Sequence, residues 1–196
     1  NKNIINFLNK FASYNLIPKG MALKLLMGNN ISDHTKDIGL PKKKIIKQYN
    51  FKLSQEQTES LKIMNKFNKK FRVHVLRGVT GSGKTIVYFK ALKEIIDNGS
   101  QALIMLPEIG LTAQFEKKFE EFFGFKPSIW HSGVSKKNKQ IAWANIVNGS
   151  EKVVIGARSS LFLPFKKLGL IIVDEEHDQS YKQDEGIIYN ARDMAI

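Results

Sequence analysis

An eight-residue phrase rich in glycine constrains this chain more than any other feature of its sequence. The phrase reads Gly78, Val79, Thr80, Gly81, Ser82, Gly83, Lys84 and Thr85. It fits the pattern G-x-x-x-x-G-K-[ST], in which backbone N–H groups surround phosphates and the lysine contacts the terminal ones. All eight residues are therefore predicted to bind ATP. The alternative is a glycine-rich turn that only joins a strand to a helix.

The segments on either side of this phrase agree with a phosphate-binding loop. Residues 71–77 (FRVHVLR) are β-branched and apolar enough for a short strand, and residues 85–97 place apolar side chains at helical spacing. A helix that begins at such a loop points its N–H groups and its positive dipole end at the phosphates. This order of strand, loop and helix favours nucleotide binding over a simple turn.

A second motif follows the apolar run 168–173 and reads Asp174, Glu175, Glu176 and His177. The Asp174 carboxylate and the Thr85 hydroxyl are predicted to hold Mg²⁺, and Glu175 is predicted to be the base that activates the attacking water. Lys84, Asp174 and Glu175 are thus the candidate catalytic residues. The alternatives are a solvated acidic turn and, for His177, an ordinary hydrogen-bonded loop residue.

Apolar periodicity from residue 53 onward predicts alternating strands and helices. The predicted strands are 71–77, 101–106, 127–131, 152–156 and 168–173. The predicted helices are about 54–68, 85–97, 111–123 and 136–148. The connections are long enough for parallel pairing, and the strands 101–106 and 168–173 are mostly apolar, as in strands covered on both faces. The predicted fold is therefore α/β, with a central parallel sheet in one lobe over residues 53–196.

The front of the chain has a different pattern. In residues 1–27, apolar side chains at helical spacing predict two short amphipathic helices, separated by a proline and a glycine. Residues 28–52 turn to Asn, Asp, Gly, Pro and Lys and are predicted to be a linker. The chain starts with Asn1 and stops in an apolar segment at Ile196, so we expect it to be a piece of a longer protein.

Composition narrows the possible partners. Of the net charge of +13, +10 lies in residues 1–70, which favours a polyanion such as DNA; the lysine bias of an AT-rich genome explains the charge equally well. The chain has no cysteine, which excludes disulfides and thiolate metal sites. No apolar run approaches the roughly 18 residues of a membrane span, and no signal peptide opens the chain. We therefore expect a cytoplasmic protein without a membrane partner.

Several further motifs accompany the two described above. They are residues 53–57 (LSQEQ), 107–112 (PEIGLT), 131–133 (HSG), 156–162 (GARSSLF), 172–178 (IVDEEHD), 180–183 (SYKQ) and 189–193 (YNARD). Taken together with the glycine-rich phrase, these motifs resemble the replication-restart helicases of helicase superfamily two. The resemblance covers most of residues 53–196.

This resemblance implies a RecA-like P-loop NTPase lobe, preceded by a short helical remnant of an N-terminal DNA-binding region. It implies a 3′ to 5′ DNA helicase that uses ATP and Mg²⁺, acts on forked or single-stranded DNA and works with other primosome and replication-restart proteins. Gln57 would contact adenine. The second motor lobe and the zinc-binding cysteines would lie in an absent C-terminal part, so the isolated chain is expected to hydrolyse hardly any ATP.

Candidate DNA contacts lie in two segments, and the residues predicted to make them are Arg158, Ser159, Tyr181, Lys182 and Arg192. Arg158 with Ser159 is suited to contact phosphates. Tyr181 and Tyr189, flanked by the two basic residues, are predicted to stack exposed bases, and ordinary packing under a loop is the alternative. The resemblance implies that the loop 178–192 couples DNA contact to ATP hydrolysis.

Two other functions remain open on the sequence. One is a nucleic-acid-binding adaptor whose nucleotide pocket is structural and whose basic front half is the working surface. The other is a different superfamily-two translocase, such as the motor subunit of a restriction enzyme.

Overall fold

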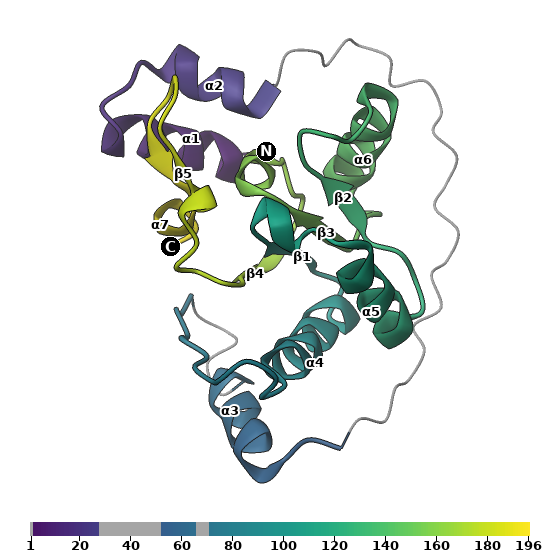
Figure 1. Cartoon of the computed structure of the whole chain (residues 1–196). Helices are drawn as coiled ribbons and strands as arrows, with labels where there is room; N and C mark the ends of the chain where they lie inside the picture. The colour runs from purple at the N-terminus through teal and green to yellow at the C-terminus, as the bar shows by residue number, and fades with distance from the viewer. Residues whose placement is uncertain (1, 28–51, 66–70) are drawn as a thin grey trace.

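The computed structural model describes residues 2–27, 52–65 and 71–196, and its centre is a parallel sheet of four strands in the order β2-β3-β1-β4 (Figure 1). The strands are β1 (Gln101–Met105), β2 (Ser128–Trp130), β3 (Val153–Gly156) and β4 (Leu168–Val173). In the register of the sheet, Leu103 of β1 pairs with Val154 of β3 and with Ile171 of β4. The α/β class and the parallel sheet predicted from the sequence are therefore confirmed.

Four longer helices accompany the sheet: α3 (Gln55–Asn65), α4 (Lys84–Asp97), α5 (Ala113–Phe123) and α6 (Lys136–Asn148). Local signals set their ends. The Thr112 side chain accepts a hydrogen bond from the N–H of Phe115 and begins α5, and Gly124, at φ 73°, ends it. Ser135 caps α6 in the same way. Hydroxyls at helix starts and glycine at helix ends satisfy backbone groups that the helix itself leaves unpaired.

The remaining elements are short, apart from the first. They are α1 (Lys2–Tyr14), α2 (Lys19–Met27), η1 (Glu108–Gly110), η2 (Arg158–Phe162), η3 (Gln179–Tyr181), β5 (Lys182–Gln183), β6 (Tyr189–Asn190) and α7 (Ala191–Met194). β5 and β6 form an antiparallel hairpin after the main sheet. The two helices predicted within residues 1–27 are confirmed by α1 and α2.

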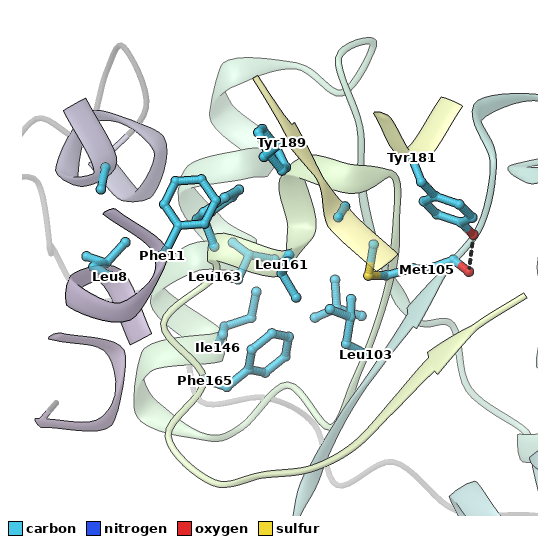
Figure 2. Close-up of a cluster of buried hydrophobic side chains, with 14 of the residues drawn as sticks. Leu8, Phe11, Leu103, Met105, Ile146, Leu161, Leu163, Phe165, Tyr181 and Tyr189 are labelled. Atoms are coloured by element: carbon cyan, nitrogen blue, oxygen red, sulfur yellow. Dashed lines mark hydrogen bonds between the residues drawn. The ribbon is translucent and has the colours of Figure 1, made fainter. Parts of the chain in front are cut away.

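The sheet separates two apolar cores because successive side chains of a strand point to opposite faces. Ala102 and Ile104 of β1 belong to one core, in which Phe89 of α4 contacts phenylalanines of α5. Leu103 and Met105 belong to the other core, which includes residues of α1, α6 and η2 (Figure 2). In Figure 1, α4 and α5 accordingly lie on one side of the sheet, and α1, α2 and α7 lie on the other.

The helix α1 belongs to the second core rather than standing apart from the lobe. The Phe11 side chain is only 2% exposed, and its ring makes edge contacts with Phe162 at 5.0 Å and with Tyr189 at 5.5 Å between centroids. Figure 2 shows Phe11 in the same cluster of buried side chains as Leu161, Leu163 and Tyr189. Residues from the two ends of the described chain therefore stabilise one another.

One predicted strand is wrong. Residues 71–77 have no regular secondary structure, and Phe71 and Val75 are 73% and 77% exposed. A strand exists only within a ladder of hydrogen bonds, and no strand among the described residues pairs with this segment. The predicted linker at 28–52, apart from its last residue, and the end of the predicted helix 54–68 lie outside the described residues.

The other predicted strands and helices from 85 onward agree with the observed elements to within two residues at each end. Within residues 2–27, 52–65 and 71–196, no helix is long and apolar enough to cross a membrane.

Replacing Phe11 tests whether α1 is part of the folded lobe. Phe11→Ala should lower the free energy of unfolding by about 3 to 5 kcal/mol, because the change leaves a ring-sized cavity in a packed core. Urea unfolding followed by circular dichroism measures this loss. Tyr14→Ala, on the exposed side of the same helix, should change stability by no more than about 0.5 kcal/mol. Equal effects of the two changes would contradict the packing of α1 against the lobe.

Tyr189 generates a prediction for alkaline pH. Burial raises the pKa of Tyr189 to about 12, and the nearby Arg158 guanidinium partly opposes this rise. The folded chain therefore favours the neutral phenol, a contribution to stability that is present below pH 10 and is lost as the pH rises toward 12. Between pH 10 and 11.5, the free energy of unfolding of Tyr189→Phe should fall less steeply with pH than that of the unmodified chain. The two slopes should differ by up to about 1.4 kcal/mol per pH unit.

Urea midpoints across this range measure the difference in slope. Between pH 7 and 8 the two proteins should have the same slope, since this phenol is neutral there in both states. Parallel curves up to pH 11.5 would refute the burial of the Tyr189 hydroxyl.

Candidate nucleotide-binding site

The glycine-rich phrase forms a tight loop directly before α4. Gly81 and Gly83 have φ values of 82° and 81°, in the left-handed region that side chains disfavour, and Gly83 is the N-cap of α4. A Cβ on Gly78 would lie 2.5 Å from the Ser82 hydroxyl, and one on Gly83 would lie 2.5 Å from the Gln57 amide nitrogen. The backbone conformation at Gly81 and Gly83 therefore favours glycine, and a side chain at Gly78 or Gly83 would displace Ser82 or Gln57. A loop that wraps closely around phosphates has this property.

The Lys84 side chain folds back over the loop from the first position of α4. Its Nζ donates hydrogen bonds to the carbonyl oxygens of Gly78, at 2.6 Å, and Val79, at 3.3 Å. The ammonium group therefore lies above the loop backbone, beside the N-terminus of α4 where the helix dipole also attracts anions. Loop, cation and helix end together fit a triphosphate.

Gln57 contacts this loop and also helps to cap the start of α3. Its backbone N–H donates to the Ser54 hydroxyl, and its Oε1 accepts from the Ser54 N–H, which forms a reciprocal capping box. The Gln57 Nε2 donates to the carbonyl oxygen of Ser82 at 2.8 Å. The predicted nucleotide residue thus lies beside the loop, while its contact with adenine stays a prediction.

Asp174 follows β4 at the carboxyl edge of the sheet, and its backbone N–H continues the ladder by donating to the carbonyl oxygen of Met105. Its Oδ2 accepts a hydrogen bond from the Tyr88 hydroxyl at 2.8 Å, and Thr85 interacts with the same hydroxyl and lowers its pKa. The two predicted magnesium ligands, Thr85 and Asp174, therefore lie on either side of one tyrosine hydroxyl. The structure brings the two sequence motifs together in one site.

Tyr88 is the site residue that the sequence reasoning missed, having been assigned only to the apolar face of its helix. Its burial, followed by the negative charge of Asp174, raises the pKa of the Tyr88 hydroxyl well above its usual value, so the group is a neutral donor. Its position gave a signal, because Tyr88 stands one helical turn after Thr85 and the two side chains share a face.

The donor set suits magnesium. Hydroxyl and carboxylate oxygens are the ligands that Mg²⁺ prefers, and this ion is usually held by one or two protein groups together with phosphates and water. The described residues contain no group of three or more His, Cys, Asp or Glu side chains that could hold a metal by themselves. Thr85 and Asp174 therefore fit an ion that arrives with a nucleotide.

Glu175, the predicted base, is exposed and has an unusual backbone. Its φ of 47° lies in the left-handed region, which costs a residue with a Cβ about 1 kcal/mol. The turn is closed by the N–H of Asp178, which donates to the Glu175 carbonyl oxygen. Nε2 of His177 lies 3.7 Å from Oε2 of Glu175. The turn projects the Glu175 carboxylate into solvent, next to the histidine.

The predicted DNA contacts differ in their surroundings. Arg158 donates through Nη1 to the carbonyl oxygens of Ser180, at 3.1 Å, and Lys182, at 3.0 Å, so it holds the segment that leads into β5. Ser159 is exposed beside it. Arg192 forms an ion pair with Glu176 of the acidic turn. Both arginines therefore tie the segment 176–192 together.

The prediction that Tyr181 and Tyr189 stack exposed bases is not met by this arrangement. The two rings are 1% and 4% exposed, so neither offers a face to a base. The Tyr181 hydroxyl donates to the carbonyl oxygens of Met105, at 2.9 Å, and Asp174, at 2.6 Å; Figure 2 shows the first bond. A phenol ring is apolar while its hydroxyl needs a partner, and the core behind the site supplies both.

Comparison with known proteins agrees with this geometry. Residues 54–195 match the family described as DEAD/DEAH box helicase. The chain is 46% identical to the replication restart protein PriA of Rickettsia conorii over 194 residues. These residues are 98% of this chain and 29% of the relative. It is 43% identical over 125 residues to PriA of Bacillus subtilis, covering 64% of this chain and 16% of the relative.

The PriA protein of Haemophilus influenzae is 45% identical over 130 residues, which cover 66% of this chain and 18% of that protein. The chain thus spans about three tenths of the length of the Rickettsia relative and less of the other two. The family match covers more than half of this chain. The chain belongs to the DEAD/DEAH box helicase family.

Proposed function

We propose that this chain is the first ATP-binding motor lobe of a DNA helicase that acts in replication restart. One observation carries the proposal. The hydrogen bond from the Tyr88 hydroxyl to Asp174 joins α4, the helix that follows the phosphate-binding loop, to the acidic turn, and this loop and this turn are the two parts that ATP hydrolysis requires. The replication-restart role is supported by the names of the relatives, and a 3′ to 5′ direction of unwinding is part of the proposal.

Each residue of the site has a separate task in this proposal. Bound ATP with magnesium supplies the phosphoryl bond to be broken and the cation that neutralises charge on its phosphates. Lys84 turns from the loop carbonyls to the terminal phosphates, and Thr85 and Asp174 hold the cation. Glu175 orients the attacking water and accepts its proton.

The partner in this proposal is forked or single-stranded DNA, together with other primosome and replication-restart proteins. Arg158, Ser159 and Lys182 are the proposed phosphate contacts, because their side chains lie at the surface around η2 and β5. The bonds from Arg158 to the carbonyls of the segment 180–182 would transmit a change at the DNA toward Asp174. The proposal places this work in the cytoplasm, where such DNA and ATP are found.

Nucleotide binding by this chain gives the first test. With a fluorescent ATP analogue and magnesium, Lys84→Ala should weaken binding at least tenfold, because the change removes the charge above the loop. The matched control is Lys93→Ala, which removes a lysine paired with Asp97 on the exposed side of the same helix. Fluorescence anisotropy measures both. Equal affinities of the two variants would count against a nucleotide site at the loop.

The second test uses the complete native protein with fork DNA. Glu175→Gln should bind ATP normally and lower DNA-stimulated hydrolysis by about 10²-fold or more, because the amide cannot accept a proton from water. Glu121→Gln, on the surface of α5, is the control and should hydrolyse ATP at the normal rate. An assay with labelled 3′ and 5′ tails reports the direction of unwinding.

Two results of the same assays would favour other functions. A DNA affinity that is the same with and without nucleotide, and the same in Lys84→Ala, would favour a nucleic-acid-binding adaptor. ATP-driven movement along duplex DNA without separation of the strands would favour another kind of translocase.

A further inference from the structure

Tyr88 occupies an unusual position for a hydroxyl group. The side chain is 5% exposed, and its ring makes an edge contact with Phe89 at 5.3 Å within the core that α4 and α5 share. A phenylalanine would fill this place with less desolvation cost, because burying a hydroxyl is unfavourable unless it is bonded. The hydroxyl is satisfied by Asp174 beyond β4, which accepts its hydrogen bond.

The Tyr88 hydroxyl has one proton, and this proton goes to Asp174. An ionised carboxylate only accepts hydrogen bonds, so the Tyr88 hydroxyl is the donor and Asp174 Oδ2 is the acceptor, at 2.8 Å. Thr85, one helical turn earlier on α4, interacts with the same hydroxyl and lowers its pKa.

The hydrogen bond from Tyr88 leaves acceptor positions on Asp174 free for a cation. An ionised carboxylate has about four acceptor positions, of which Tyr88 uses one at Oδ2 and the N–H of Glu175 uses one at Oδ1. Both Asp174 oxygens therefore keep a position for the cation or for one of its waters.

We propose that Tyr88 is a positioning residue that orients the magnesium ligand Asp174 through its hydroxyl. The inference rests on the proposed nucleotide function and assigns to that site a residue that touches neither phosphate nor metal. Its ring anchors α4 in the core, while its hydroxyl fixes the direction of a carboxylate that lies 86 positions later in the sequence. The hydroxyl, and not the ring, carries the effect on magnesium.

Tyr88→Phe separates these two roles because it keeps the ring and removes the hydroxyl. Binding of a fluorescent ATP analogue to this chain is measured once in excess magnesium and once in EDTA. The affinity in EDTA should stay within about twofold of the unmodified chain, since Lys84 and the loop are unchanged. The gain in affinity on adding magnesium should fall by roughly tenfold, the factor expected for one hydrogen bond to a charged acceptor.

Tyr189→Phe is the matched control, because it removes a hydroxyl from another buried tyrosine, packed in the other core. It should leave the magnesium-dependent gain unchanged. Mn²⁺ gives a second measure independent of turnover: electron paramagnetic resonance should show weaker capture of Mn²⁺ by the nucleotide complex of Tyr88→Phe than by that of Tyr189→Phe.

A double-substitution cycle shows whether Tyr88 acts through Asp174. If it does, the combination of Tyr88→Phe with Asp174→Asn should lose little more magnesium-dependent affinity than Asp174→Asn alone, because coupled changes are not additive. A magnesium-dependent gain in Tyr88→Phe equal to that of the unmodified chain would overturn the inference, as would equal losses with magnesium and with EDTA. If the unmodified chain binds no nucleotide under either condition, the proposed function fails first and the inference falls with it.

Discussion

The burial of β1 on both faces is the constraint on which the rest of the structure depends. Every residue from Gln101 to Met105 is buried, and alternate side chains belong to the two different cores. At the end of this strand, the single carbonyl oxygen of Met105 accepts bonds from the N–H of Asp174 and from the Tyr181 hydroxyl. The position of the acidic turn is therefore set by the strand that both cores share.

This arrangement explains how a site forms from segments far apart in the chain. Parallel strands bring their carboxyl ends to one edge of the sheet, where loops with different sequences meet. Asp174 arrives there after β4, and Thr85 and Tyr88 arrive on α4, which packs its phenylalanine side against the same sheet. The tyrosine hydroxyl then makes the direct link that neither backbone makes alone.

Much of the fold follows from local signals. The apolar runs at 101–106 and 168–173 predict strands that the structure contains. The ends of α5 and α6 are set by hydroxyl caps and by the glycines that follow, and each of these signals acts within a few residues. The strand predicted at 71–77 had the same kind of pattern and is absent. A strand forms only where a neighbouring strand pairs with it, and the residues 71–77 alone do not show whether such a neighbour exists.

The candidate site also has a part that the local sequence predicts and a part that depends on distant contacts. The phrase from Gly78 to Thr85 and the acidic turn at 174–177 are recognisable from residue type and spacing alone, because glycine, lysine and carboxylate have few substitutes for holding phosphate and metal. Their roles in binding and catalysis remain predictions. The surroundings of the tyrosines could not be predicted in this way, because a tyrosine can either stack on a base or fill a core.

By itself, then, the sequence determined the succession of elements and the chemical groups of the two motifs, since periodicity, caps and glycine positions are properties of neighbouring residues. Only the tertiary structure decided that Tyr88 bonds Asp174, that Arg158 holds the segment 180–182 and that Tyr181 points inward. These facts depend on contacts between residues 22 to 86 positions apart, which exist only after the sheet and its two cores have formed.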